Sequence, residues 1–148
     1  MSKSAPKSLF ERLGGRPTYE KVHKIFYDKI FADSWLLPFF EDIDQGVLEE
    51  QQTDFQIQIT GGPPKYCGKL PVAAHKHMFI TEEIYMHRHE LLRQSLVEAE
   101  IEPALRDEWL AIDLSFKRAL IKRSPDECQK RYATDEIIIV KKPANFAA

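Results

Sequence analysis

Apolar residues recur at every third or fourth position over most of the chain, a pattern that predicts amphipathic helices. Pro17 suits the first turn of a helix, and the apolar face that follows it consists of Tyr19, Val22, Phe26 and Ile30, widened by Tyr27 and Phe31. A short helix over residues 9–13 is expected to end at Gly14-Gly15, because glycine commonly stands just beyond a helix C-terminus.

The middle of the chain predicts a third helix, which Asp44 caps at its N-terminus. Its apolar stripe contains Leu48, Gln52, Phe55 and Ile59. The glycine and proline residues at positions 61–64 end this helix, since proline cannot continue one.

The second half of the chain predicts a loop over residues 65–70, followed by three further helices. The first is a short helix that Pro71 opens and that runs through His75. The next starts at Thr81 and runs to about Glu98, because a threonine followed by two glutamates is a favourable helix start. Pro103 opens a final long helix, whose stripe is Leu105, Trp109, Ile112, Phe116 and Leu120.

The C-terminal residues give weaker signals. Ser124 and Glu127 form a capping box, which predicts a further short helix. Residues 137–140 form the only segment that resembles a strand, and one strand cannot form a sheet. The last dozen residues carry no assignment, so the pattern as a whole predicts an all-α protein.

Composition narrows the class of protein. The 148 residues are 43% hydrophobic, and 21 basic against 23 acidic residues give a net charge of -2, so neither nucleic acid nor a membrane surface is an expected partner. No apolar segment is long enough to cross a bilayer, and residues 1–12 contain no apolar signal region. Cys67 and Cys128 form no CxxC motif, which excludes a disulfide framework and a covalent c-type haem. A reduced, cytoplasmic protein is expected.

Two polar residues occupy positions where the stripes call for apolar ones. Gln52 lies between Leu48 and Phe55, and Tyr27 lies on the broad face of the second helix. A buried amide or phenol needs a hydrogen-bond partner. The two side chains could therefore bond to each other or converge on a small polar ligand. Alternatively, Tyr27 reaches the surface and Gln52 bonds to the backbone.

The histidines do not form a metal cluster in the sequence. His75 and His77 are two residues apart, as are His87 and His89, and on a helix such pairs point about 160° apart. A zinc site with Cys67 would have too few ligands. His75 shares an approximate face with Val72 and Phe79 and is expected to point inward, as a satisfied core residue or as a metal ligand. His77, His87 and His89 are expected at the surface.

Arg88 falls on the apolar stripe of its helix. We expect its stem to pack on apolar surface while the guanidinium reaches water. The alternative is a cation that faces an anion in a pocket.

In combination and in order, several motifs resemble the truncated haemoglobins, the small two-over-two globins. The motifs run from Leu9 to about Lys122 and comprise the Gly14-Gly15 pair, the Phe26-Tyr27 pair, Asp33 followed by Leu37-Pro38-Phe39-Phe40, the Gly61-Gly62-Pro63-Pro64-Lys65-Tyr66 loop, and His75 before Phe79-Ile80-Thr81. The surroundings of Asp44 and Gln52 look most like the first group of the family. The resemblance implies a single truncated-globin domain over residues 1–148, with a core at about 9–123 and a C-terminal extension, 124–148, of unassigned role.

The resemblance also implies a non-covalent haem b, iron protoporphyrin IX, with His75 as the proximal ligand of a five-coordinate iron. Tyr27 and Gln52 match the distal hydrogen-bonding residues, and Gln51 and Phe26 are expected beside them. Residues that match haem contacts are Phe40, Leu48 at the distal gate, Tyr66 and Phe79. Lys65 and Lys69 are expected near the propionates. A phenol or amide donor would slow the release of dioxygen.

Two positions depart from the family pattern. Gln56 stands where some members of the first group have a phenylalanine that is proposed to gate a gas tunnel, so that mechanism does not carry over. Arg88 stands where an apolar residue usually faces the haem, which implies either a shifted helix or an additional charge in the distal pocket.

Several functions share such a site. The resemblance implies reversible binding of dioxygen, with NO and CO as further ligands, in a monomer or weak dimer. Oxygen storage or transport and NO detoxification are preferred to sensing, for which no output domain is apparent. NO dioxygenase or peroxidase-like turnover would need an external electron donor such as a reductase. The alternatives are a cofactor-free helical interaction module and a zinc hydrolase.

Overall fold

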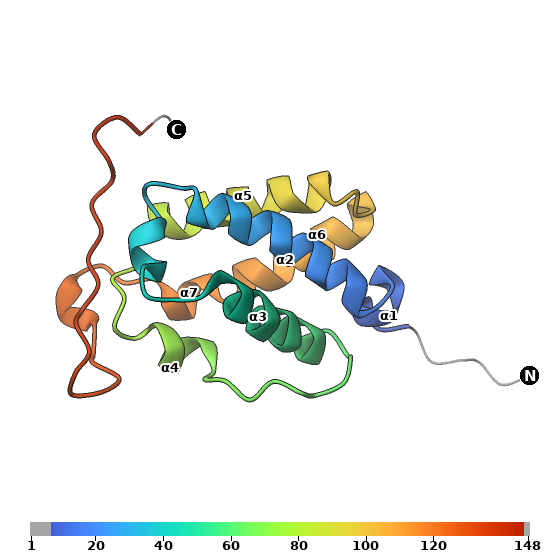
Figure 1. Cartoon of the computed structure of the whole chain (residues 1–148), viewed down its shortest axis with the longest axis horizontal. Coiled ribbons are helices and arrows are strands. Elements are labelled where there is room, and N and C mark those ends of the chain that lie inside the picture. Colours follow the sequence, from blue (N-terminus) through green and yellow to red (C-terminus); the bar gives the residue numbers. More distant parts are fainter. Residues whose placement is uncertain (1–6, 147–148) are drawn as a thin grey trace, which may run out of the picture.

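The computed structural model describes residues 7–146, and within them it contains helices, turns and loops but no strand. In chain order the helices are α1 (Leu9–Leu13), α2 (Arg16–Phe31), the 3-10 helix η1 (Leu37–Phe40), α3 (Gln45–Ile59), α4 (Pro71–His75), α5 (Glu82–Glu98), α6 (Pro103–Ser115), α7 (Lys117–Leu120) and the 3-10 helix η2 (Pro125–Glu127) (Figure 1). The prediction of an all-α protein is confirmed.

The helix ends follow from local chemistry. The Asp44 and Thr81 side chains each accept a hydrogen bond from a backbone N–H in the first turn of α3 and α5, as the sequence predicts. Gly14 follows α1 with a φ of 93°, a left-handed conformation that favours glycine. At Gly62 a Cβ atom would lie 2.5 Å from the Ile57 side chain, so only glycine lets the chain turn this closely after α3.

The long helices form two layers. Helix α2 packs against α3 in one layer and against α5 in the other, and α6 packs along α5 (Figure 1). This arrangement is a two-over-two helical sandwich. The short helix α4 lies apart from the long helices and packs against α7. The apolar faces of the two layers point toward a shared interior, where Tyr19, Val22, Phe26, Ile30 and Leu96 are buried.

The expected final helix from Pro103 through Leu120 is interrupted, and this prediction was wrong. Helix α6 ends at Ser115, and Phe116 joins it to α7. The Tyr85 hydroxyl of α5 donates a 2.6 Å hydrogen bond to the Asp113 carbonyl, the group that residue 117 would use in a continuous helix. At the break, a side chain from the neighbouring helix therefore replaces one backbone hydrogen bond of a continuous helix.

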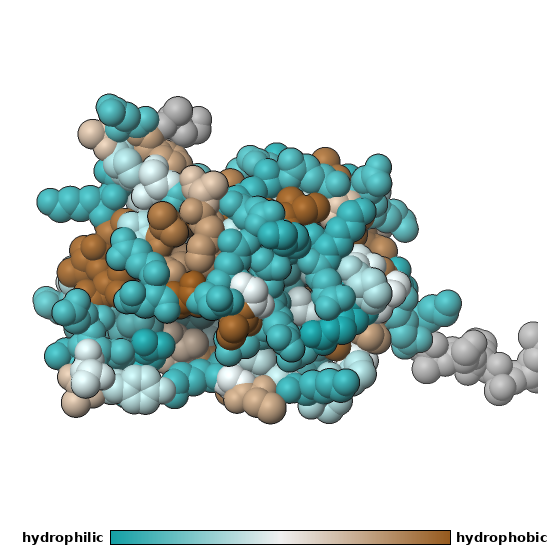
Figure 2. Space-filling model, in the orientation of Figure 1, coloured by the Kyte–Doolittle hydropathy of each residue, from teal (hydrophilic) through white to brown (hydrophobic). Residues whose placement is uncertain are grey.

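The C-terminal segment covers the link between α4 and α5. The backbone N–H of Gln129 donates to Lys76, that of Ile138 donates to His77, and that of Phe79 donates to Ile138. Ile138 makes one isolated parallel bridge with Met78, so the expected strand at 137–140 amounts to a single bridge. Figure 1 shows this segment at the end of the molecule opposite the N-terminus, and in Figure 2 hydrophobic side chains gather near it on an otherwise mostly hydrophilic face.

The expectation that three histidines lie at the surface was wrong. His77 is 3% exposed, because the C-terminal segment lies over it. His87 and His89 of α5 are half-buried and pair with carboxylates of other elements, His87 with Asp33 at 2.6 Å and His89 with Asp113 at 2.7 Å. No described helix combines the length and the apolar composition that a membrane span needs.

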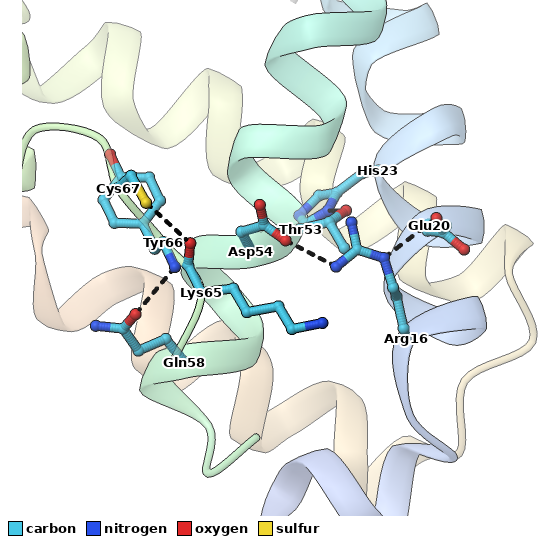
Figure 3. Close-up of polar contacts among 9 residues, drawn as sticks. All are labelled: Arg16, Glu20, His23, Thr53, Asp54, Gln58, Lys65, Tyr66 and Cys67. Carbon is cyan, nitrogen blue, oxygen red and sulfur yellow. Dashed lines mark hydrogen bonds and ion pairs between the residues drawn. The ribbon is translucent and has the colours of Figure 1, made fainter. Parts of the chain in front are cut away.

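A buried histidine links three helices in the core. Nδ1 of His23 of α2 lies 2.7 Å from the Thr53 hydroxyl of α3 (Figure 3). The His23 ring also meets the Trp109 ring of α6 edge-on. Burial, together with the smaller effect of the nearby Arg88 charge, lowers the pKa of His23 to about 3. The imidazole is therefore neutral at neutral pH.

The His23→Gln variant should lose less stability in acid than the wild type. The folded protein holds the His23 pKa at about 3, below the ordinary 6.5. The contribution of the neutral imidazole to the free energy of unfolding is therefore complete above pH 6.5 and is lost as the pH falls toward 3. Between these limits it changes by about 1.4 kcal/mol per pH unit. Urea unfolding of both proteins from pH 7 to 4.5 measures the difference, and parallel stability curves would contradict the assignment.

Candidate functional site

A cavity opens between the two helical layers and the short helix α4. It receives side chains from α2, η1, α3, α4, α5, α6 and α7 and from the segment that follows α4. Its apolar wall consists of Phe26, Ile30, Leu36, Phe39, Phe40, Leu48, Phe55, Pro71, Met78, Ile80, Ile84, Phe116 and Leu120. Its polar lining consists of Tyr27, Gln52, Gln56, His75, Tyr85, Arg88 and Asp113. A concave apolar pocket with few polar groups is typical of a cofactor site.

His75 presents one free ring nitrogen to this cavity. Its Nδ1 lies 2.6 Å from the Pro71 carbonyl oxygen, which can only accept, so Nδ1 carries the proton and Nε2 keeps its lone pair. Burial lowers the pKa of His75 to about 4, which keeps the imidazole neutral. A neutral imidazole held through its second nitrogen by a backbone carbonyl is the usual form of a metal-ligating histidine.

His75 belongs to no cluster of metal-ligating side chains among the described residues. Residues 7–146 contain no group of three His, Cys, Asp or Glu side chains that could hold a metal ion. Cys67 is exposed in the loop after α3, where its thiol lies 3.4 Å from the Lys65 carbonyl (Figure 3). The site therefore suits a metal whose other ligands come from a macrocycle, and the geometry disfavours the zinc alternative.

Two polar side chains line the cavity without a protein partner. Tyr27 is 5% exposed, and its hydroxyl makes no hydrogen bond with any described residue. Burial raises the pKa of Tyr27 well above its usual value, so the phenol keeps its proton. The Gln52 amide likewise has no partner among residues 7–146. Neither the expected mutual bond nor the backbone bond of Gln52 forms, so both donors are free to meet a ligand.

Gln56 is a cavity residue whose structural role the sequence did not reveal. It lies one helical turn after Gln52 on α3, and its side-chain oxygen is buried without a hydrogen-bond partner within residues 7–146. Its spacing of four from Gln52 is the signal that could have placed it in the cavity. Gln51, which we expected beside Gln52, is exposed instead, because adjacent positions on a helix point about 100° apart.

The expected haem contacts divide into two sets. Phe40 and Leu48 line the cavity, as does Phe26, which was expected beside Tyr27 and Gln52. Phe79 does not, because neighbouring side chains in an extended segment point to opposite sides, and Met78 and Ile80 take the cavity side.

The loop after α3 also departs from expectation. Tyr66 lies behind the cavity wall, with its ring 5.1 Å from that of Phe55 and its hydroxyl donating to the Lys69 carbonyl. Lys65 and Lys69 are exposed, and Lys69 Nζ lies 5.0 Å above the Tyr132 ring. The structure therefore brings neither lysine nor Tyr66 into the cavity.

The expectation that Arg88 points outward was wrong. Its guanidinium lines the cavity, and Nη1 donates to both oxygens of Asp113, at 2.8 and 3.0 Å. Burial alone would raise the pKa of Asp113, but the Arg88 charge and the His89 hydrogen bond outweigh it and lower the pKa. The expectation assumed an unpaired cation. Asp113, four residues after Trp109 on the inner face of α6, supplies the counter-charge.

Comparisons with known proteins agree with this site. The family of bacterial-like globins matches residues 8–120. A group 1 truncated hemoglobin from Chlamydomonas moewusii is 30% identical over 122 residues, which cover 81% of this chain and 71% of the relative. A group 1 truncated hemoglobin from Tetrahymena pyriformis is 38% identical over 73 residues, 49% of this chain and 60% of the relative. The match thus spans about three fifths of the Tetrahymena protein.

Solved structures give the same result. The Fe(III) form of truncated hemoglobin from Tetrahymena pyriformis has a TM-score of 0.73 at 28% identity and aligns with 79% of this chain and 100% of its own. The 2/2 hemoglobin of a Synechococcus species has a TM-score of 0.72 at 27% identity, with the same coverage of 79% and 100%. The two-over-two sandwich is therefore a globin fold, and the chain belongs to the truncated haemoglobins. Its cofactor is haem, which the free Nε2 of His75 and the apolar cavity fit.

Replacing His75 and His77 in turn should show which of the two histidines binds the haem iron. His75→Gly is expected to abolish stable haem retention or to make it depend on added imidazole, because the described residues offer no other suitably placed ligand. His77→Ala is the matched control and should leave the absorption spectrum nearly unchanged, since His77 does not line the cavity. Absorption spectra of the ferric, ferrous and carbonyl forms measure both, and exchanged results would refute the assignment.

Proposed function

We propose that this haem protein reversibly binds dioxygen, and also NO and CO. In this proposal His75 is the proximal ligand of the iron, and Tyr27 and Gln52 donate hydrogen bonds to the bound gas. Binding of small gases in general follows from membership of the truncated haemoglobins. The observation that carries the finer proposal is the Tyr27 hydroxyl, buried on the cavity wall without a partner among the described residues.

The proposed roles follow from the states of the side chains. When bound, haem iron supplies an open coordination position for a diatomic gas. His75 is neutral and held through Nδ1, which leaves Nε2 for the iron. Tyr27 keeps its proton and donates to a polar gas ligand, and the Gln52 amide adds a second donor. The surrounding apolar wall excludes water and strengthens both hydrogen bonds.

For the physiological role we propose oxygen binding and storage or NO detoxification. Turnover as an NO dioxygenase or a peroxidase would draw electrons from an external reductase, because the cofactor has to be returned to its starting oxidation state. The free Nε2 of His75 and the unpartnered donors around the cavity argue against a cofactor-free interaction module, since they would remain unsatisfied.

The remaining proposals concern the chain as a whole. We propose one domain over residues 1–148, with 124–148 as an extension of the 9–123 core, in a cytoplasmic monomer or weak dimer. The two unpaired cysteines support a reducing compartment, and the net charge of -2 supports the absence of nucleic-acid and membrane partners.

Removing the Tyr27 hydroxyl should accelerate dioxygen release at least tenfold. A hydrogen bond to a charged acceptor contributes about 1.5–3 kcal/mol, which corresponds to roughly 10- to 150-fold in an equilibrium. Carbon monoxide is less polar when bound, so its release from Tyr27→Phe should change much less. Stopped-flow rates for both gases provide the measurement.

Tyr66→Phe is the matched control for this prediction. It removes the same phenol oxygen from a residue that lies behind the cavity wall. Its dioxygen release should stay near that of the wild type. Equal acceleration of both gases in Tyr27→Phe, or equal effects of the two variants, would refute the hydrogen-bond role of Tyr27.

A further inference from the structure

The Arg88–Asp113 pair leaves part of the guanidinium unused. Only Nη1 of Arg88 bonds to Asp113, and Nε and Nη2 make no hydrogen bond with any described residue. A guanidinium has five N–H donors, so at least three of them lack a protein partner here. The Arg88 side chain is 30% exposed and lines the cavity, whereas the Asp113 side chain is 4% exposed.

The carboxylate of the pair is held from the other side. His89 Nδ1 lies 2.7 Å from Asp113 Oδ2, and the Tyr85 hydroxyl fixes the Asp113 backbone carbonyl. Asp113 therefore has several partners in the protein, while its cation has one. The anchored carboxylate positions the arginine through one nitrogen. The other N–H donors of the guanidinium are therefore available to a second anion.

The Arg88 guanidinium lies on the side of the cavity where Tyr27 is found. The guanidinium carbon lies 5.3 Å from the centre of the Phe26 ring, and that ring lies 4.9 Å from the Tyr27 ring. Helices α2 and α5 thus bring a phenol donor and a cation to the same wall. Desolvation lowers the pKa of Arg88, but the charge of Asp113 outweighs it, so the arginine stays protonated.

Stability alone gives little reason for this pair. A buried ion pair can be replaced by apolar residues of similar volume at little cost, and often with a gain in stability. Arg88 occupies a stripe of otherwise apolar positions on α5, where an aliphatic residue would complete the wall. Binding of an anionic ligand therefore explains the charge at this position better than stability does.

We propose that Arg88 gives the distal pocket an affinity for small monovalent anions, of which nitrite and azide are representatives, through the free donors of its guanidinium. The inference rests on the proposed function, because the anion binds in the pocket that the haem completes. Asp113 is a positioning residue in this proposal: it holds the guanidinium and does not contact the anion. The pocket thereby accepts neutral gases through Tyr27 and anions through Arg88.

The test compares anion and gas affinities of the haem-loaded protein. Arg88→Met keeps most of the aliphatic stem and removes the charge and the donors. We expect it to lower the affinity of the ferric form for azide and nitrite at least tenfold, and to change the affinity of the ferrous form for CO much less. A tenfold change corresponds to about 1.4 kcal/mol. Optical titrations at constant ionic strength give all three affinities.

Arg93→Met is the matched control for charge. Arg93 lies on the same helix, pairs with Glu90 and has a side chain that is 50% exposed, so the variant removes one positive charge without touching the cavity. It should keep the azide and nitrite affinities of the wild type. Equal losses in the two variants would assign the effect to net charge and overturn the proposal.

A double variant keeps the test decisive if Arg88→Met folds poorly. Arg88→Met leaves Asp113 buried without its cation, and Arg88→Met/Asp113→Asn removes both charges. The double variant should show the same loss of anion affinity. Unchanged azide and nitrite affinities in a variant that still binds haem and CO would overturn the proposal.

Two further outcomes are distinguishable. If Arg88→Met loses haem rapidly to apomyoglobin while its anion affinity stays unchanged, the free donors serve a haem propionate and the proposal is wrong. If the wild-type protein takes up no haem, or takes it up equally well as His75→Gly, the proposed function itself fails. The haem-loading spectra therefore separate failure of the function from failure of the anion proposal.

Discussion

Polar atoms that line an apolar cavity must be satisfied by the protein or by the occupant of the cavity, because an unpaired buried polar group carries a free-energy penalty. The centre of the molecule follows this constraint. Nδ1 of His75 meets it through the Pro71 carbonyl, and Arg88 meets it in part, because only its Nη1 bonds to Asp113. Tyr27 and Gln52 find no partner among the described residues, so their donors are left for a ligand. The pattern of satisfied and unsatisfied groups thus outlines the place where haem and its ligand belong.

The same constraint explains why charge enters the cavity as a pair. A lone guanidinium in an apolar wall would be too costly, and Asp113 offsets that cost from the neighbouring helix. His89 and Tyr85 then hold Asp113 in place. The interaction joins α5 to α6 at the cavity and fixes the direction of the cation. Packing and charge are coupled here through one buried carboxylate.

The side of the cavity that carries His75 is shaped by the C-terminal segment. Backbone hydrogen bonds from Gln129 and Ile138 hold it against the link that follows His75. Met78 and Ile80 consequently face the cavity, while His77 is covered. The C-terminal segment thus stabilises the link that joins α4, which carries His75, to α5.

The sequence by itself determined most of the helices, their capping by Asp44 and Thr81, the placement of Tyr27 and Gln52 on apolar helix faces, and the inward position of His75. These features depend on local spacing and on the chemistry of neighbouring residues, both of which can be read from the sequence. Only the tertiary structure decided that Arg88 points inward, that His77 is buried and that Met78 and Ile80 replace Phe79 at the cavity. Periodicity identifies which face of a helix is apolar, but it cannot identify the partner of a polar residue on that face. The partner of Arg88 stands 25 residues away on another helix, and the cover of His77 comes from a segment near the C-terminus.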